Sequence, residues 1–130
     1  MGTVYAGTLT VPPQTPLTQP ARNFIDLPRG MITRIDVLIP WGHGGLTGLQ
    51  IWVQETPILP APPGAWIVGN DSLYTFPVTI PIDQEPLGVW LVGYNEDEYY
   101  EHTFYVFVTL EESSRLAILR NFMQLFGFGG

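Results

Sequence analysis

The stretch Met31-Ile32-Thr33-Arg34-Ile35-Asp36-Val37-Leu38-Ile39 decides the fold class of this chain. Its apolar residues Ile35, Val37 and Ile39 point to one face of an extended backbone, while Arg34 and Asp36 point to the other. A period of two residues is typical of a strand in an antiparallel sheet with one face in water. The stretch therefore predicts a half-buried β-strand, which begins after a turn at residues 28–30.

The same alternation recurs on both sides of this stretch. Pro77 interrupts one of the further segments and predicts an edge or bulged strand, because proline cannot donate to a sheet ladder. Four prolines exclude residues 57–64 from a central strand. Short strands separated by turn residues, with no helix between them, predict an all-β fold: a jelly-roll-like antiparallel β-sandwich of about eight strands. The further strands are predicted at residues 3–11, 22–27, 48–54, 65–68, 72–80, 87–95 and 102–110.

The end of the chain breaks this pattern. Apolar side chains there recur at three- and four-residue spacing, which is typical of an amphipathic helix. We therefore divide the chain into a β-sandwich domain at residues 1–112 and a helical tail at residues 113–130, for docking or oligomerisation. The sequence leaves open whether the tail packs on its own sheet or on another chain. The predicted contact stripe of the tail consists of Leu116, Leu119, Phe122, Met123 and Phe126.

Charged residues are scarce, and acidic residues outnumber basic ones. They make up 13% of the 130 residues, and twelve acids against five basic residues give a net charge of −7. A partner nucleic acid requires a basic patch, and an anionic membrane would repel this chain, so we expect neither as a partner. Cysteine is absent, which excludes disulfides and thiolate metal sites. A surface so poor in charge is typical of one that other proteins partly cover.

Motifs for catalysis are missing from the sequence. It holds no P-loop, dinucleotide fingerprint, nucleophile elbow or zinc-protease motif. Of its two histidines, we expect His43 in a loop and His102 on a strand beside acids. The acids near residues 95–98 are contiguous and lack the alternate spacing of a calcium loop, so they predict a solvated hairpin tip. We therefore expect no catalytic residue, no cofactor and no bound metal.

Among the aromatic residues, Trp52 is the one that alternation places away from the core, and we select it as an interface residue. Tyr105 and Phe107 also lie opposite the core side of their strand, which predicts a covering element from the tail or from a neighbouring subunit. Exposed rings can equally stack on sugars. The alternative function is therefore a carbohydrate-binding module, with a platform drawn from Trp41, Trp52, Trp66, Tyr99 and Tyr100.

Several segments carry a resemblance to a known group of proteins: residues 27–37, Ile39-Pro40, Gly44-Gly45-Leu46, and residues 94–98 followed by His102-Thr103. On the basis of these segments, about the first 110 residues resemble small β-sandwich structural proteins of tailed viruses, which decorate the capsid or form minor virion components. The resemblance implies a homo-oligomer that contacts other virion proteins, such as the major capsid protein. It also implies a virion location after synthesis in the host cytoplasm, and no catalytic residues. The proline-rich segments 12–20 and 57–63 are interpreted as arms that lie across neighbours.

Overall fold

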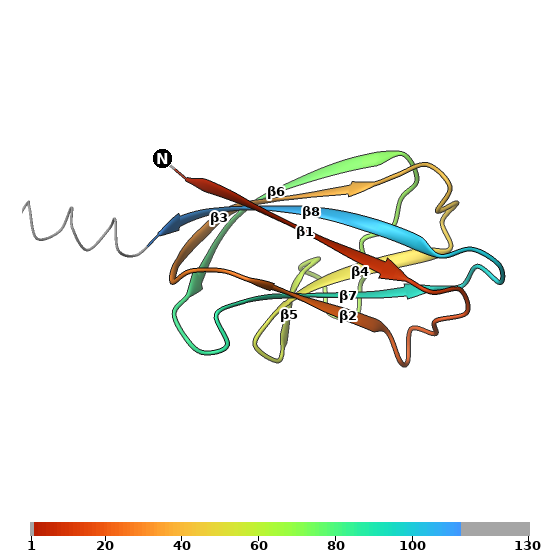
Figure 1. The fold of residues 1–130 in the computed structure, drawn as a ribbon, viewed down its shortest axis with the longest axis horizontal. Coiled ribbons are helices and arrows are strands. Elements are labelled where there is room, and N and C mark those ends of the chain that lie inside the picture. The colour runs from red at the N-terminus through yellow and green to blue at the C-terminus, as the bar shows by residue number, and fades with distance from the viewer. Residues whose placement is uncertain (1, 113–130) are drawn as a thin grey trace, which may run out of the picture.

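Two antiparallel sheets of four strands each form the fold of residues 2–112, the part of the chain that the computed structural model describes (Figure 1). The all-β prediction is confirmed, while the predicted helix and its five contact residues lie outside the described residues. The strands are β1 (Thr3–Val11), β2 (Ala21–Asp26), β3 (Gly30–Ile39), β4 (Thr47–Val53), β5 (Thr56–Leu59), β6 (Ser72–Ile82), β7 (Gly88–Asn95) and β8 (His102–Glu112).

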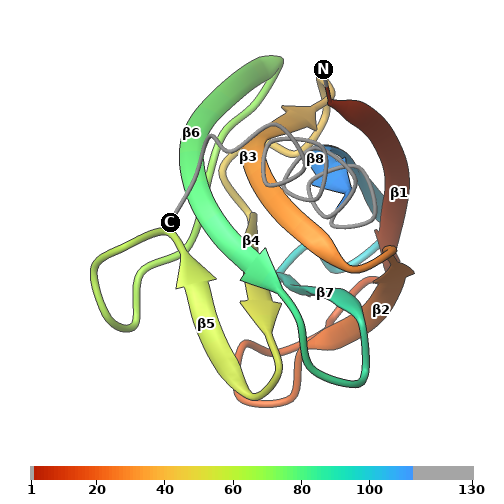
Figure 2. The same ribbon diagram turned by 90° about the vertical axis from the view of Figure 1, so that its left-hand side faces the viewer.

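Strands from opposite ends of the chain pair with each other. The first sheet has the order β1-β8-β3-β6 and the second the order β2-β7-β4-β5. Thus β1 pairs with β8, β2 with β7, β3 with β6, and β4 with β5. The chain therefore resembles one long hairpin that is rolled up into two layers, which Figure 2 shows from one end.

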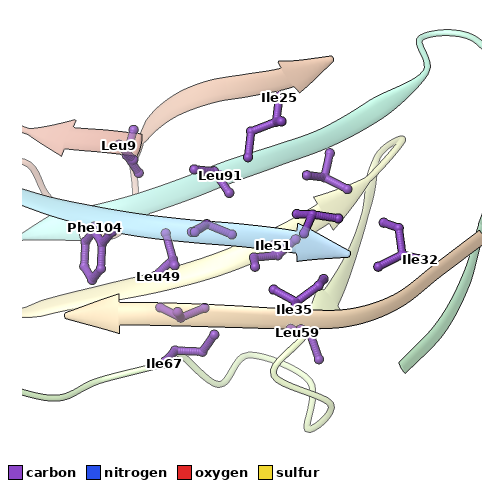
Figure 3. Packing of buried hydrophobic residues seen from close by; sticks show 14 of the residues in the cluster. Leu9, Ile25, Ile32, Ile35, Leu49, Ile51, Leu59, Ile67, Leu91 and Phe104 are labelled. Atoms are coloured by element: carbon purple, nitrogen blue, oxygen red, sulfur yellow. The ribbon is translucent and has the colours of Figure 1, made fainter. Parts of the chain in front are cut away.

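The core lies between the two layers and follows the predicted alternation. Ile35, Val37 and Ile39 are fully buried, as the opening stretch predicts. Phe104 comes from β8, which lies next to β3 in the same sheet, and Leu91 comes from β7 in the opposite sheet. Figure 3 shows Ile35, Phe104 and Leu91 in the space between the sheets. Full burial of such a side chain stabilises the fold by about 1.5–3 kcal/mol, so this layer of contacts holds the two sheets together.

Two strand predictions differ from the structure. The predicted strand at residues 65–68 is wrong, because only Ile67 forms a single bridge there, to Leu49. The missed strand is β5, which lies partly in the proline-rich stretch and includes Pro57. β5 is an edge strand, where a residue without an N–H is tolerated. The prediction of an edge strand around Pro77 is confirmed, since β6 is the last strand in the order of the first sheet.

The first proline-rich segment is attached to its own domain. The N–H of Thr15 donates to the carbonyl of Asn95 at 2.8 Å, and the N–H of Asn95 donates back to Thr15 at 2.9 Å. The N–H of Gln14 also donates to the carbonyl of Asp97. Gln14 and Thr15 are therefore bonded to the hairpin that follows β7 and to the end of β7, so this part of the segment lies on its own domain.

Neighbouring residues of β8 provide a test of the two faces. Phe104→Ala is expected to lower the free energy of unfolding by about 3–5 kcal/mol, because a fully buried ring is lost and a cavity remains. Tyr105→Ala, one residue on, is expected to cost less than about 1 kcal/mol, because that ring is partly in water. Urea unfolding followed by circular dichroism measures both values. Equal losses would contradict the assignment of faces.

Candidate functional site

Trp52 lies on the outer face of the second sheet, where alternation places it. In the register of β4 and β7 it stands directly opposite Trp90, while their neighbours Ile51 and Leu91 face the core. Phe24 of β2 stands opposite Trp90 on the other side, with ring centroids 4.9 Å apart. Three aromatic rings from three adjacent strands therefore form one row on this face.

A cation covers this row. The guanidinium carbon of Arg22 lies 5.1 Å from the ring centroid of Trp52 and 5.8 Å from that of Trp90. A cation at this distance from a ring is attracted by its π-electrons. We call Arg22, Phe24, Trp52 and Trp90 the Arg22 cluster. Trp and Arg are the residue types that most often dominate the energy of protein interfaces, so the cluster is a candidate contact site.

Hydrogen bonds fix the position of Trp52. Its indole Nε1 donates to Oε1 of Gln50 at 2.9 Å, and Nε2 of Gln50 donates to the carbonyl of Ala65 at 2.8 Å. Gln50 is buried and Trp52 is half-buried. Neither side chain needs to reorganise before contact, which reduces the entropic cost of binding.

A shallow groove borders the Arg22 cluster. Arg22 and Trp90 line it together with Gln54, Glu55 and Gln84. The side-chain Nε2 of Gln54 donates to the carbonyl of Gln84 at 2.9 Å, which ties the turn after β4 to the loop between β6 and β7. The groove therefore presents an aromatic wall, one cation and one carboxylate on a fixed frame.

The outer face of the first sheet carries a second candidate surface. Leu38 of β3 stands opposite Leu73 of β6 on one side and opposite Tyr105 of β8 on the other. These side chains are 36%, 64% and 39% exposed, and we call the three the apolar row. Cross-strand neighbours of this kind lie within about 5 Å of each other, so the row is continuous. No element among residues 2–112 covers it, and contiguous exposed apolar surface commonly marks a contact site.

A buried histidine joins the loops at one end of the sandwich. His43 is only 1% exposed. Its Nε2 lies 3.0 Å from the carbonyl of Thr103, and its Nδ1 lies 2.7 Å from the hydroxyl of Thr47. Because a carbonyl only accepts, Nε2 carries the proton, and the Thr47 hydroxyl donates to Nδ1. Both ring nitrogens of a neutral His43 are therefore hydrogen-bonded in this arrangement.

The second histidine lies beside the first. The two rings are 4.7 Å apart, and Nε2 of His102 lies 2.9 Å from Oδ2 of Asp97. Oδ1 of Asp97 accepts the backbone N–H groups of Tyr99 and Tyr100. The N–H of Tyr99 and the bond from His102 are the main causes that lower the pKa of Asp97. Burial lowers the pKa of His43, and the nearby His102 adds to this.

The contacts of this histidine pair are internal to the domain. Thr47, whose hydroxyl is hydrogen-bonded to His43, is fully buried. Asp97 uses both of its oxygens inside the hairpin, which agrees with the interpretation of the acidic run as a hairpin tip. Within the described range no three metal-binding side chains gather. The sequence placed His43 in a loop correctly, but it gave no signal that the ring is buried against a hairpin some sixty residues away.

Comparisons with known proteins assign no family to this chain, so we infer its function from its surfaces. Scans against protein-family models, curated protein sequences and solved structures give no match to this chain. In the described part of the chain, no helix is long and apolar enough to cross a membrane. Of the predicted interface residues, Trp52 lies in the Arg22 cluster and the other five belong to residues 113–130.

The burial of His43 predicts a loss of stability in mild acid. The pKa of folded His43 lies below that of the unfolded chain, about 6.5, so the unfolded state takes up the proton first. Stability from His43 is therefore complete at neutral pH and falls as the pH drops below about 6.5. The lowered pKa of Asp97 acts in the same direction at more acidic pH.

Urea unfolding at several pH values measures this effect. The native protein is expected to lose stability between about pH 7 and pH 5, and His43→Ala should remove most of that dependence. The variant should also be less stable at pH 7 by about 2–3 kcal/mol, since a buried ring and two hydrogen bonds are lost. An unchanged pH dependence in His43→Ala would refute the assignment to His43.

Proposed function

We propose that this chain is a non-enzymatic structural protein that acts through protein–protein contacts, as a homo-oligomeric capsid decoration or minor component of a virion. One observation carries the proposal: the strand orders β1-β8-β3-β6 and β2-β7-β4-β5. We interpret this rolled hairpin as a jelly roll, an architecture that is common in viral capsid domains. Because one fold serves many functions, the surfaces must supply the rest of the argument.

The surfaces favour contact with protein. The apolar row supplies uncovered apolar area on one sheet, and the Arg22 cluster supplies Trp and Arg side chains in fixed positions on the other. Only 13% of the chain is charged, and the centres of protein interfaces are depleted of charge. In a virion, these two faces would contact further copies and other virion proteins such as the major capsid protein.

The solution mass of the full chain tests self-assembly. By light scattering, the full chain is expected to form an oligomer. A chain that ends at Glu112 should form particles with fewer copies, because the tail stripe is lost. Leu73→Asp should also lower the mass, since it places a charge in the apolar row. Thr79→Asp, on the same strand but outside the row, is the matched control and should leave the mass unchanged. A monomeric full chain would rule out self-assembly.

Carbohydrate binding is the second candidate, because lectin domains also use jelly rolls. Trp52 and Trp66 are poorly suited to stacking on a sugar. Arg22 covers the ring of Trp52, and Trp66 packs edge-on against Tyr94. Trp41 is 80% exposed, and Tyr99 and Tyr100 are exposed at the same end of the sandwich. Sugar rings stack on exposed aromatic faces of this kind.

A glycan array separates the two candidates. If the chain is a lectin, binding should be lost in Trp41→Ala and retained in Trp52→Ala, because only the first ring is free. If it is a structural protein, no glycan should show dose-dependent binding. Binding that depends on Trp52 and not on Trp41 would contradict this placement of the site.

A further inference from the structure

The ends of the two sheets offer four edge strands. They are β1 and β6 in the first sheet and β2 and β5 in the second. An edge strand presents backbone N–H and C=O groups that another strand can pair with. Natural proteins protect such edges with prolines, charged side chains or short strand length, so an edge without these features is a candidate for pairing.

Three of the four edges are protected. The second half of β6 contains Pro77 and Pro81, which lack the N–H that a new strand would need, and the loop before β6 is bonded to its first half, where the hydroxyl of Tyr74 donates to the carbonyl of Val68. β5 has four residues and includes Pro57. β2 has six residues and carries a charge near each end. Each of these strands is therefore a poor template for an added strand.

β1 differs from the other three edges. Its nine residues, TVYAGTLTV, contain no proline and no charged side chain, and all nine pair with β8 on one side only. Near its C-terminal half, Nδ2 of Asn23 on β2 donates to the carbonyl of Thr8 at 2.7 Å, which covers that part of the edge. Among residues 2–112, no strand pairs with the outer side of the stretch from Thr3 to Gly7, where Val4 and Ala6 are exposed.

We propose that Thr3 to Gly7 pairs, antiparallel, with the same residues of a second copy of this chain. The two-fold axis would be perpendicular to the first sheet, so that two four-stranded sheets join into one. This inference rests on the homo-oligomer of the proposed function and names the strand that joins the copies.

A second copy is the occupant that the residues favour. A two-fold contact uses the same stretch on both copies, and a residue i of one copy meets a residue j of the other, so the stretch must be complementary to itself. The side chains of the stretch carry no charge, and the hydroxyl of Tyr5 donates to the carboxylate of Glu112 in its own copy at 2.7 Å, so the paired residues themselves bring no like charges together. With Tyr5 on the axis, the outward side chain of Val4 would lie opposite Ala6 of the second copy, beside Phe107, which pairs with Ala6. The new contact would thus extend the apolar outer face of the sheet.

Cysteine cross-linking of the full chain tests the pairing directly. The chain has no cysteine, so an introduced thiol has no competitor. Opposite residues in antiparallel strands lie about 4.5–5.5 Å apart between Cα atoms, a distance that a disulfide spans. We would compare Val4→Cys, Ala6→Cys and the double variant with Thr79→Cys on the edge strand β6. Under mild oxidation, the double variant, in which Cys at position 4 lies opposite Cys at position 6 of the second copy, should form a covalent dimer about tenfold faster than Thr79→Cys.

A charge on the edge provides the second measurement. Ala6→Lys adds the kind of side chain that protects natural edges, and it faces water in the single copy. Its mass by light scattering should fall about twofold relative to the native oligomer, while Thr79→Lys should leave the mass unchanged. Circular dichroism of each variant verifies that the sandwich is folded.

The outcomes separate the two proposals. An oligomer that keeps its mass in Ala6→Lys, and whose β1 cysteines react no faster than Thr79→Cys, overturns the pairing of β1 and leaves the structural function in place. A full chain that is monomeric overturns both. Rapid cross-linking at β1 together with the loss of mass in Ala6→Lys supports both.

Discussion

The pairing of β8 with both β1 and β3 is the interaction on which the rest of this structure depends. It joins residues from opposite ends of the described chain, as in the pair of Thr3 and Leu110. The inner side of β8, from Phe104 to Leu110, also supplies fully buried side chains to the core. Because the first and last strands must meet before the sheet is complete, the two layers form as one cooperative unit. Topologies of this kind, with mostly non-local pairing, fold slowly.

Commitment of the inward side chains to the core leaves function to the outward ones. Most inner positions on the strands are buried, so the outer positions and loops supply most of the surface that is available for contacts. On the first sheet these outer positions form the apolar row, and on the second sheet they form the Arg22 cluster. The two surfaces lie on opposite sides of the sandwich, an arrangement that allows one copy to contact two partners at once.

The parts that the sequence predicts are those that depend on local alternation. The strands around Ile35 and Leu9, and the outward direction of Trp52, follow from a period of two residues. β5 was missed because a proline reads as a break unless the strand is known to lie at an edge. The burial of His43 depends on contact with a hairpin remote in sequence. The position of Arg22 over Trp52 depends on strand register, which the alternation of one strand does not fix.

The distribution of charge connects these surfaces with assembly. Most of the acidic residues lie between strands, as in the hairpin at residues 96–101, while β1 and the apolar row carry none. A net charge of −7 repels other copies at long range and keeps the chain dispersed. At short range, the repulsion acts mainly where loops approach loops, so it disfavours end-to-end contacts. Contacts through sheet edges and sheet faces would avoid this penalty, so the charge distribution favours the proposed association through β1 and the outer faces over one through the loops.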